Sequence, residues 1–316
     1  MSSRCSNGGP AVGRSDRGGL TAGFVFCALA VAPPHARPPD RLTARPPVLR
    51  VCSDPNNLPF SNRKGEGFEN RIAELIAGEL HTTVRYYWWP QRRGFIRNTL
   101  GAGRCDLVVG IPASDGQVLA TRPYYTSTYV FLSRRSSGLG IRSLDDPRLR
   151  HLRIGLHFIG DDYHNTPAAA ALARRGVVRN LVGYSIYGDY SRPNPPARLI
   201  DAVARGEVDV AIVWGPFAGY FGPRTGLPLV STPVTPALDG PALPFTFAIA
   251  AGVRRGDTAL QARVDRALES ARPRILAVLE RYGVPLVAGP GAMRSSGASD
   301  LAGVKPASTP KEPPCD

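Results

Sequence analysis

The side chains in this sequence that could act on another molecule are mainly aromatic rings, arginines and a few carboxylates. Histidine is sparse, and His81, His151, His157 and His164 have no Ser or Cys partner at a recognisable spacing. A nucleophile and its base therefore cannot be assigned. No CxxC motif or Cys/His cluster indicates a metal or haem site. These features predict a non-enzymatic protein without a cofactor.

Aromatic residues are the main candidates for binding. Seven lie in motifs at predicted strand ends or loops: Trp88, Trp89, Tyr124, Tyr125, Tyr187, Tyr190 and Trp214. Such rings suit a planar ligand or a loop of a partner protein, because aromatic residues and Arg dominate binding hot spots. Adjacent residues on a strand point to opposite faces, so at most one of Trp88 and Trp89 reaches a shared cleft, and about half of the seven rings should be structural.

Charged candidates accompany these rings. Arg92, Arg93 and Arg97 fall in a predicted short helix over 91–100, with positions 93 and 97 on one face. They could contact an anion or an acidic partner, or simply form a solvated helix face. Asp161 and Asp162 could join Asp54 in holding a cation, but their place just before a predicted helix is also typical of acids at a helix N-terminus. We therefore predict no metal site.

One stretch, residues 49–80, indicates how these side chains are positioned. An apolar run at 49–52 predicts a strand, and a loop rich in Asp, Asn, Pro and Gly follows at 53–67. Apolar residues then recur at helical spacing, at Phe68, Ile72, Leu75, Ile76 and Leu80. Ligands of α/β domains lie outside the carboxyl ends of the strands, so residues 54–69 should face a cleft. Asp54, Asn56, Asn57 and Phe60 are its candidate residues.

The rest of the chain repeats this pattern. Strands are expected at 84–89, 106–111 and 128–133, and a second α/β unit at 152–214 contains strands at 152–156, 181–185 and 209–214. Helices are expected at 168–175, after Asn165-Thr166-Pro167, and at 195–205. A last strand at 245–252 precedes a helical stretch that Pro273 should divide. The pattern predicts an α/β protein with two lobes joined by two crossing segments, near 126–133 and 244–250, around a central cleft.

The boundaries and the predicted location of the protein follow from composition. Arg4, Arg14 and Arg17 precede an apolar run of 13 residues, 20–32, which is too short for the ~20 residues of a membrane span. We predict a signal peptide at 1–36, a Pro/Arg-rich lead-in at 37–47, the first lobe at 48–130 and 245–288, the second lobe at 131–244, and a disordered tail at 289–316. The protein should be periplasmic.

The net charge of the 316-residue chain is +14, with 36 Arg and 3 Lys. This excess could favour encounter with an acidic partner, or reflect an Arg-rich solvated surface. Nucleic-acid binding is not expected, because the sequence has no Lys/Arg block, zinc spacing or RNA-binding aromatic motif.

Two of the five cysteines, Cys52 and Cys105, fall within the predicted fold. Cys52 ends one predicted strand and Cys105 begins another. If these strands are parallel neighbours, the two sulfur atoms start at opposite ends, and a disulfide would require a bend in the chain. We favour two buried free thiols.

Several motifs resemble one protein family. They are DPNNLPFSNRKGEGFEN at 54–70, WWPQRRGFIRNTL at 88–100, RPYYTSTYVF at 122–131, the stretch from YGDYSRPNPPARL to DVAIVWGPFAGYF at 187–221, and PFTFAIAAGVRRGD at 244–257. Over about residues 48–287 the chain resembles the quinoprotein-dehydrogenase-associated binding proteins of the MoxJ/XoxJ type, which share the general plan of amino-acid-type periplasmic binding proteins. The resemblance implies a type II periplasmic binding protein fold.

The sequence departs from ordinary amino-acid binders at two positions. Such proteins usually hold the ligand carboxylate with an Arg in a Thr-x-Glu-Arg-like segment, but residues 112–117 contain no Arg. They usually hold the ligand ammonium with an Asp at the end of the strand equivalent to 209–214, where this chain has Trp214. A buried charge needs a counter-charge, so a zwitterionic amino acid is not the expected ligand.

By this resemblance, the chain is expected to bind and assist the activation or maturation of a pyrroloquinoline-quinone-dependent methanol-dehydrogenase-type quinoprotein, with the cytochrome c of that enzyme as a further partner. The alternative is a receptor that delivers a small aromatic or quinone-like solute to an ABC importer. An electron-transfer role is not expected, because no haem or copper ligand set occurs in the sequence.

Overall fold

The computed structural model describes residues 47–158, 166–186, 190 and 192–288. The predicted signal peptide, almost all of the lead-in and the C-terminal tail therefore lie outside the described residues. No helix of the described part is long and apolar enough to cross a membrane.

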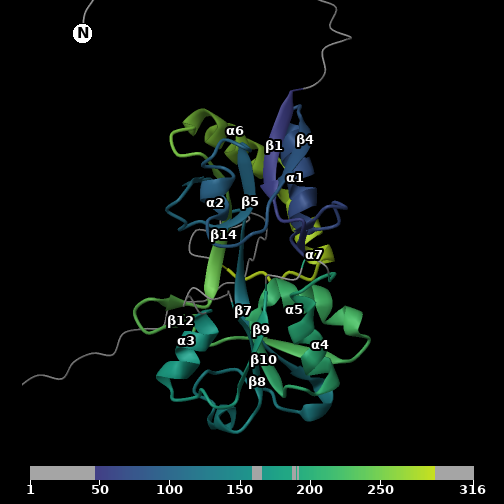
Figure 1. Ribbon diagram of the computed structural model, residues 1–316, viewed down its shortest axis with the longest axis vertical. Helices are drawn as coiled ribbons and strands as arrows, with labels where there is room; N and C mark the ends of the chain where they lie inside the picture. The colour runs from purple at the N-terminus through teal and green to yellow at the C-terminus, as the bar shows by residue number, and fades with distance from the viewer. Residues whose placement is uncertain (1–46, 159–165, 187–189, 191, 289–316) are drawn as a thin grey trace, which may run out of the picture. The chain divides into compact units, whose positions relative to one another are not determined.

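The first lobe is built on a sheet with strand order β4-β1-β5-β14. Its elements are β1 (Val48–Ser53), α1 (Phe68–Glu79), β4 (Thr83–Trp88), α2 (Phe95–Asn98), β5 (Leu107–Pro112), β14 (Thr246–Val253), α6 (Thr258–Ser270) and α7 (Arg272–Arg281). Strands β4, β1 and β5 are parallel, whereas β14 runs antiparallel to β5. The N-terminal α/β unit is thus completed by strand and helices from the far end of the chain (Figure 1).

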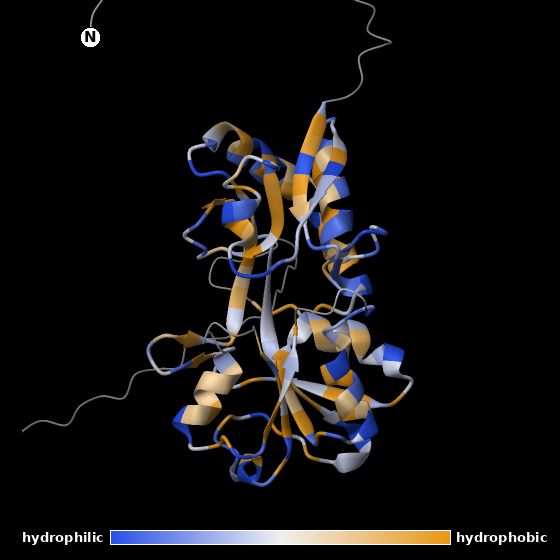
Figure 2. Cartoon of the chain, viewed as in Figure 1, coloured by the Kyte–Doolittle hydropathy of each residue, from blue (hydrophilic) through white to orange (hydrophobic). Residues whose placement is uncertain are grey.

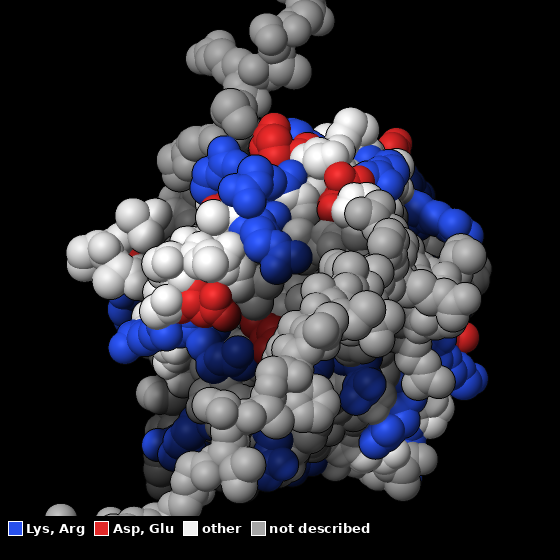
Figure 3. Space-filling model, turned by 90° about the horizontal axis from the view of Figure 1, so that it is seen from above, with Lys and Arg blue, Asp and Glu red and all other residues white. Residues whose placement is uncertain are grey.

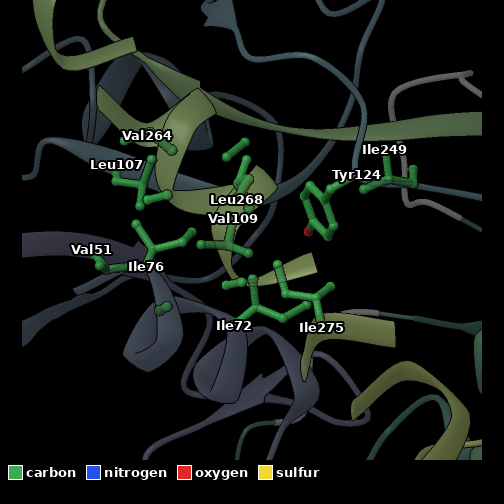
Figure 4. Close-up of a cluster of buried hydrophobic side chains, with 14 of the residues drawn as sticks. Val51, Ile72, Ile76, Leu107, Val109, Tyr124, Ile249, Val264, Leu268 and Ile275 are labelled. Carbon is green, nitrogen blue, oxygen red and sulfur yellow. The ribbon is translucent and has the colours of Figure 1, made fainter. Parts of the chain in front are cut away.

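Alternation along these strands divides the first lobe into two hydrophobic layers. Val51 and Leu107 face α1, α6 and α7 in the larger core, whereas Cys52 and Val108 face α2 on the other side. Phe68, Ile72 and Ile76 of α1 are fully buried, as their helical spacing predicts. Figure 4 shows the larger core, with the side chains of α1, α6 and α7 meeting those of the strands.

The second lobe is a sheet covered on both faces. Its elements are β7 (Tyr125–Arg134), β8 (Ile154–Phe158), α3 (Pro167–Arg174), β9 (Leu181–Ser185), α4 (Ala197–Arg205), β10 (Val210–Trp214), α5 (Gly215–Phe221) and β11 (Leu229–Pro233). One layer contains α3, and the other contains α4 and α5. Hydrophobic residues lie along its inner strands, and α4 alternates hydrophobic and hydrophilic residues (Figure 2).

Short elements complete the described fold. They are β2 (Asn56–Asn57), β3 (Ser61–Asn62), β6 (Leu119–Ala120), β12 (Leu238–Asp239) and β13 (Leu243–Pro244), with 3-10 turns at Arg135–Ser137, Pro147–Arg150 and Pro223–Thr225. As expected from Asn165-Thr166-Pro167, Thr166 is the N-cap of α3 with a Pro in the first turn. Gly206 ends α4 in the left-handed conformation.

Strands β7 and β14 join the lobes. Residues 125–128 of β7 pair with β14, and its residues 129–134 pair with β10 and β11. Strand β14 in turn pairs with β5 through residues 249–253. Two strands therefore run from one lobe into the other, so the side chains at their midpoints lie between the lobes.

A third connection is made by the segment 282–287 after α7. The Oγ of Ser127 donates a hydrogen bond to the carbonyl of Pro285 at 2.6 Å. The segment also packs closely against α5. A Cβ added at Gly219 of α5 would lie only 1.8 Å from the carbonyl oxygen of Gly283. Only glycine permits such an approach between two backbones.

Two local predictions differ from the structure. The helix expected over 91–100 is confined to α2, so Arg92 and Arg93 lie before it and Arg93 does not share a helix face with Arg97. The C-terminal helical stretch is divided, as expected, but the break is at Ala271, and Pro273 lies inside the first turn of α7. Proline is tolerated there because the first-turn amides have no intrahelical acceptor.

The prediction of two free thiols is wrong. Cys52 and Cys105 form a disulfide with their Cα atoms 5.5 Å apart. Cys52 pairs across the sheet with Val108, three residues after Cys105. Cys105 precedes β5 and lies in the same hydrophobic layer as Cys52 and Phe95 of α2. A straight strand would place a residue three positions before Val108 farther than 5.5 Å from Cys52, so the chain bends before β5 as the disulfide requires.

Candidate functional site: the cavity between the lobes

A cavity of about 340 Å³ lies where the two lobes meet. Its walls come from the loop after β1, the start of α1, the ends of β5, β8 and β10, and the crossing strands. The lining residues are Asn57, Phe60, Glu69, Gln91, Gly110, Pro112, Tyr125, Tyr129, His157, Pro167, Ile186, Trp214, Phe217, Phe247 and Ile249. No Lys or Arg of the described residues is among them, so the described part of the lining carries no fixed positive charge.

Three rings form one wall of this cavity. Tyr129 of β7, Trp214 of β10 and Phe247 of β14 have ring centroids 5.4 to 6.3 Å apart. Tyr129 and Trp214 are paired across the sheet, which places both side chains on the same face. This wall offers apolar area and the electron-rich faces of aromatic rings to a ligand.

Glu69 supplies the carboxyl group of the cavity. It is the second residue of α1, only 8% exposed, and its side chain has no hydrogen-bond partner among the described residues. The group lies against the backbone of β5, because a Cβ at Gly110 would be 1.7 Å from Oε1 of Glu69. Burial, and to a smaller extent the charge of Asp54, raises the pKa of Glu69 well above its ordinary value.

A buried amide lies at the same cavity. Asn57 is 6% exposed, and its Nδ2 donates a hydrogen bond to Oε1 of Gln91 at 3.1 Å. Its Oδ1 is buried without a partner among the described residues. Buried polar atoms are normally hydrogen-bonded, so this oxygen is an acceptor available to a ligand or a water molecule.

His157 of β8 is the titratable side chain that the second lobe adds to the cavity lining. It is 3% exposed, and burial lowers its pKa to about 4, so the ring is neutral at neutral pH. One ring nitrogen, Nε2, lies 3.2 Å from the carbonyl oxygen of Pro196, and the ring packs edge-on against Phe217. His157 is therefore an uncharged part of the wall.

Hydrogen bonds close one side of the site between the lobes. The phenolic oxygen of Tyr190 donates to Oδ2 of Asp54 at 2.9 Å. Asn56 exchanges two bonds with the same part of the second lobe, through the carbonyl of Arg192 and the amide of Asn194. The guanidinium of Arg92 lies 5.2 Å above the Tyr190 ring. We call these contacts of residues 54–56 and Arg92 with residues 190 and 192–194 the latch.

The predicted site residues that the structure describes do not all lie at the cavity. Asn57, Phe60, Tyr125 and Trp214 line the cavity. Asp54, Asn56, Arg92 and Tyr190 belong to the latch. Trp89 and Arg93 are exposed and do not line the cavity, and Trp89 stacks on Tyr87. Asp161, Asp162 and Tyr187 lie outside the described residues.

Tyr124 belongs to a different environment from its neighbour. Its ring lies in the core of the first lobe, among aliphatic side chains (Figure 4). It is 7% exposed, and burial raises the pKa of its hydroxyl well above the ordinary value. Tyr124 is thus a core residue, whereas Tyr125 reaches the cavity. Trp88 also remains outside the lining and stacks on Tyr86.

Several lining residues were not selected from the sequence. Tyr129 and Phe247 could have been found by period-two alternation, since Tyr125 and Tyr129 on β7 lie on the face shared with Phe247 and Ile249 of β14. Glu69 falls within the predicted cleft stretch 54–69, but an acid in the first turn of a helix is more commonly a solvated charge. His157 gives no sequence signal, because its burial depends on α4 and α5.

The groups that line this cavity can recognise a ligand. No group of three or more His, Cys, Asp and Glu residues in the described ranges could hold a metal ion. What converges on the cavity is a set of ring faces, one buried carboxyl group and one free amide oxygen, which are means of recognition.

Two α/β lobes, two crossing strands and a cavity between the lobes define a periplasmic binding protein. Residues 49–282 match the family of bacterial extracellular solute-binding proteins, family 3, and the chain belongs to that family. This agrees with the predicted fold class.

The match to particular relatives is more specific. The chain is 35% identical over 285 residues to protein MoxJ of Methylorubrum extorquens, covering 85% of this chain and 92% of MoxJ. Among solved structures, the periplasmic binding protein XoxJ of Methylobacterium extorquens AM1 is 38% identical with a TM-score of 0.62, and MxaJ of Methlophaga aminisulfidivorans MPT is 26% identical with a TM-score of 0.66. Each alignment covers 76% of this chain and 100% of the other. The resemblance to the MoxJ/XoxJ type is confirmed.

Proposed function

We propose that this chain is a non-enzymatic periplasmic accessory protein. It binds a pyrroloquinoline-quinone-dependent, methanol-dehydrogenase-type quinoprotein and assists the activation or maturation of that enzyme, with the cytochrome c of the enzyme as a further partner. The similarity to MoxJ along most of both chains and to the periplasmic binding protein XoxJ supports this function, because the resemblance to the MoxJ/XoxJ type implies an accessory role in methanol oxidation.

One structural observation carries the proposal beyond family membership. Trp214 lines the cavity at the position where amino-acid binders are expected to place an Asp, and no Arg of the described residues lines the cavity. A zwitterion would therefore lose the hydration of both its charges without gaining a pair of counter-charges. The fold of an amino-acid receptor is retained without its means of holding an amino acid.

The docking surface that we propose is the edge of the lobes beside the latch. Arg92 and Arg93 are exposed there, and Arg is frequent at protein interfaces because its donors are arranged in a planar fork. The chain as a whole carries a net charge of +14, and Figure 3 shows Lys and Arg gathered in groups with fewer Asp and Glu on one face. Such a surface favours encounter with an acidic partner.

The proposal is tested with the mature chain (predicted residues 37–316) and the quinoprotein dehydrogenase of the same organism. Calorimetry should detect saturable binding, and dehydrogenase turnover followed in parallel should rise.

Arg93→Ala should weaken binding by about 1 kcal/mol or more. Arg281→Ala is the matched control, because Arg281 lines a separate open groove beside α7. Absence of binding at both low and physiological salt would contradict the proposal, and an effect of Arg281 alone would move the docking site to that groove.

A second function is favoured by the cavity itself. Its volume of about 340 Å³ lies within the range of small-molecule sites, which a transport receptor for a small aromatic or quinone-like solute would need. That function predicts that a periplasmic extract raises the melting temperature of the purified chain while the dehydrogenase does not bind it.

A further inference from the structure

We propose that the cavity between the lobes binds a small organic ammonium ion. The N–H groups of this ligand donate to the carboxylate of Glu69 and to Oδ1 of Asn57, and its apolar body lies against Tyr129, Trp214 and Phe247. This inference goes beyond the accessory function and does not depend on it.

The first argument is the unpaired carboxyl group. Glu69 is more than nine-tenths buried, and no described Lys, Arg or hydrogen-bond donor contacts its side chain. Nearby Asp54 is saturated by other donors, namely the amides of Asn56 and Gln91 and the hydroxyl of Tyr190. A buried carboxylate without a counter-charge is costly, and a bound cation would supply the missing charge.

The second argument is independent of Glu69. Asn57 Oδ1 is buried and unpartnered, and Asn57 lines the same cavity. Its amide nitrogen is already committed to Gln91, so the free oxygen is fixed as an acceptor. Two acceptors at one site favour a ligand that carries at least two N–H groups, which a primary ammonium provides.

The ring wall explains why the ligand should have an apolar body. The centroids of Tyr129 and Phe247 lie 5.4 and 5.7 Å from that of Trp214, so the three rings form a continuous surface. Aromatic faces attract cations within about 6 Å and also bury methylene or aryl groups. The cavity volume of about 340 Å³ suits a ligand with one ring.

The same lining rejects other classes of solute. Because no Arg or Lys of the described residues lines the cavity, a carboxylate or phosphate ligand would meet only Glu69 and neutral groups. An amino acid would place its own carboxylate in that environment. The site should therefore discriminate between an amine and its amino-acid analogue by charge.

Protonation adds a distinguishing signature. The pKa of Glu69 is raised by burial and by Asp54, and Tyr86, Tyr124 and Tyr125 also lie near enough to interact with it, while His157 faces the cavity from β8 in its neutral form. A bound ammonium stabilises the carboxylate form of Glu69. Binding should therefore release a proton wherever Glu69 is protonated in the free protein, and the affinity should increase as pH rises toward neutrality.

The test uses the mature chain and benzylamine as the probe, which combines a primary ammonium with one ring. Benzyl alcohol, benzoate and L-phenylalanine are its matched comparisons. We expect calorimetry to show that benzylamine binds at least about tenfold more tightly than each of the three. We also expect its affinity to rise from about pH 5 to about pH 8 with proton uptake by the buffer.

Two variants make the assignment specific. Glu69→Gln keeps the size of the side chain and removes the charge, so it should fold and lose at least about tenfold in benzylamine affinity. Glu74→Gln is the control, because Glu74 lies on the same helix with its side chain half exposed and paired with Arg71. Equal binding of benzyl alcohol, tighter binding of benzoate, or unchanged affinity in Glu69→Gln would overturn the proposal. The dehydrogenase is absent from this assay, so failure here is separate from failure of the accessory function.

Discussion

Tyr190 donates a hydrogen bond to Oδ2 of Asp54 at 2.9 Å, and this bond joins residues 136 positions apart in the two lobes. Asp54 is 2% exposed and also accepts bonds from the amides of Asn56 and Gln91 at 2.7 and 2.6 Å. The carboxylate thus organises its own loop and holds the second lobe to it.

Tyr190→Phe should loosen this latch without disturbing the loop, since the two amide bonds to Asp54 remain. We expect a loss of about 1 kcal/mol in stability and faster amide hydrogen exchange at residues 54–57. Hydrogen exchange followed by mass spectrometry measures the effect. Tyr87→Phe is the matched control, because the Tyr87 hydroxyl has no hydrogen bond to a described residue while its ring stacks on Trp89. Equal exchange in the two variants would show that the latch bond contributes nothing.

The disulfide between Cys52 and Cys105 closes a loop with a sequence separation of 53. The chain-entropy treatment of such a loop gives a stabilisation of about 4 kcal/mol. We expect reductant to lower the midpoint of chemical denaturation of the oxidised protein. The double variant Cys52→Ala, Cys105→Ala should already be less stable and should show no such response. If reductant lowers both midpoints equally, the effect does not come from this disulfide.

The burial of His157 predicts a specific dependence of stability on pH. Its folded pKa of about 4 lies below the ordinary 6.5, so the unfolded chain binds a proton at a pH where the folded protein does not. Stability should therefore fall as pH decreases from about 6.5 to about 4, by up to about 3 kcal/mol.

His157→Gln should reduce this slope, whereas His151→Gln, at an exposed position, should not. Denaturation curves at several pH values measure both. Arg partners lower the pKa of four carboxyl groups below 3.8, those of Asp106, Asp146, Asp209 and Asp239. The stability that these ion pairs contribute is therefore lost at a lower pH than the His157 effect. Glu69 has the opposite effect on the pH dependence of stability. Because its pKa is raised in the folded protein, its contribution to stability decreases as pH increases above 4.5. An unchanged slope in His157→Gln would rule out the assignment.

Gly110 and Glu69 should be energetically coupled. Gly110 has φ +80°, and a Cβ there would overlap the Glu69 carboxyl group. Gly110→Ala should cost about 1–2 kcal/mol from the left-handed backbone alone, and more because Glu69 must move. In the Glu69→Ala background, the additional cost that comes from moving the Glu69 side chain should be absent. Gly65→Ala is the control, because Gly65 has φ +71° and open space around its Cα. Equal costs at positions 65 and 110 would contradict the coupling.

Helix α1 could be predicted from the sequence because its signals are periodic and local. The spacing of Phe68, Ile72 and Ile76 determines the buried face of α1, and the structure buries all three completely. The disulfide was missed because the prediction assumed that Cys105 lies on the path of a strand. Its actual place depends on the bend of the chain before β5, which no local pattern specifies.

The sequence indicated which types of residue line the cavity, but it only partly indicated the direction in which their side chains point. Trp214 was selected because a bulky ring ends a buried strand, and it lines the cavity. Tyr124 and Tyr125 could not be separated, because they are adjacent in one motif and their ring centroids lie only 5.1 Å apart, yet only Tyr125 reaches the cavity. Glu69 was not selected because its burial depends on Gly110 and on the second lobe, which lie far away in the sequence.

The position of β14 in the first sheet has a consequence for dividing this protein into fragments. The strand lies next to β5 but follows it by more than 130 residues, after all of the second lobe. A piece that ends before residue 246 would expose the hydrogen-bonding edge of β5, whose own residues Leu107, Val108 and Ile111 are apolar and pair with β14 in the intact protein. Exposed apolar edges recruit other chains, so such a piece should aggregate. The shortest useful expression product therefore retains both ends of the first lobe, and the second lobe is better removed by replacing it with a short linker than by truncation.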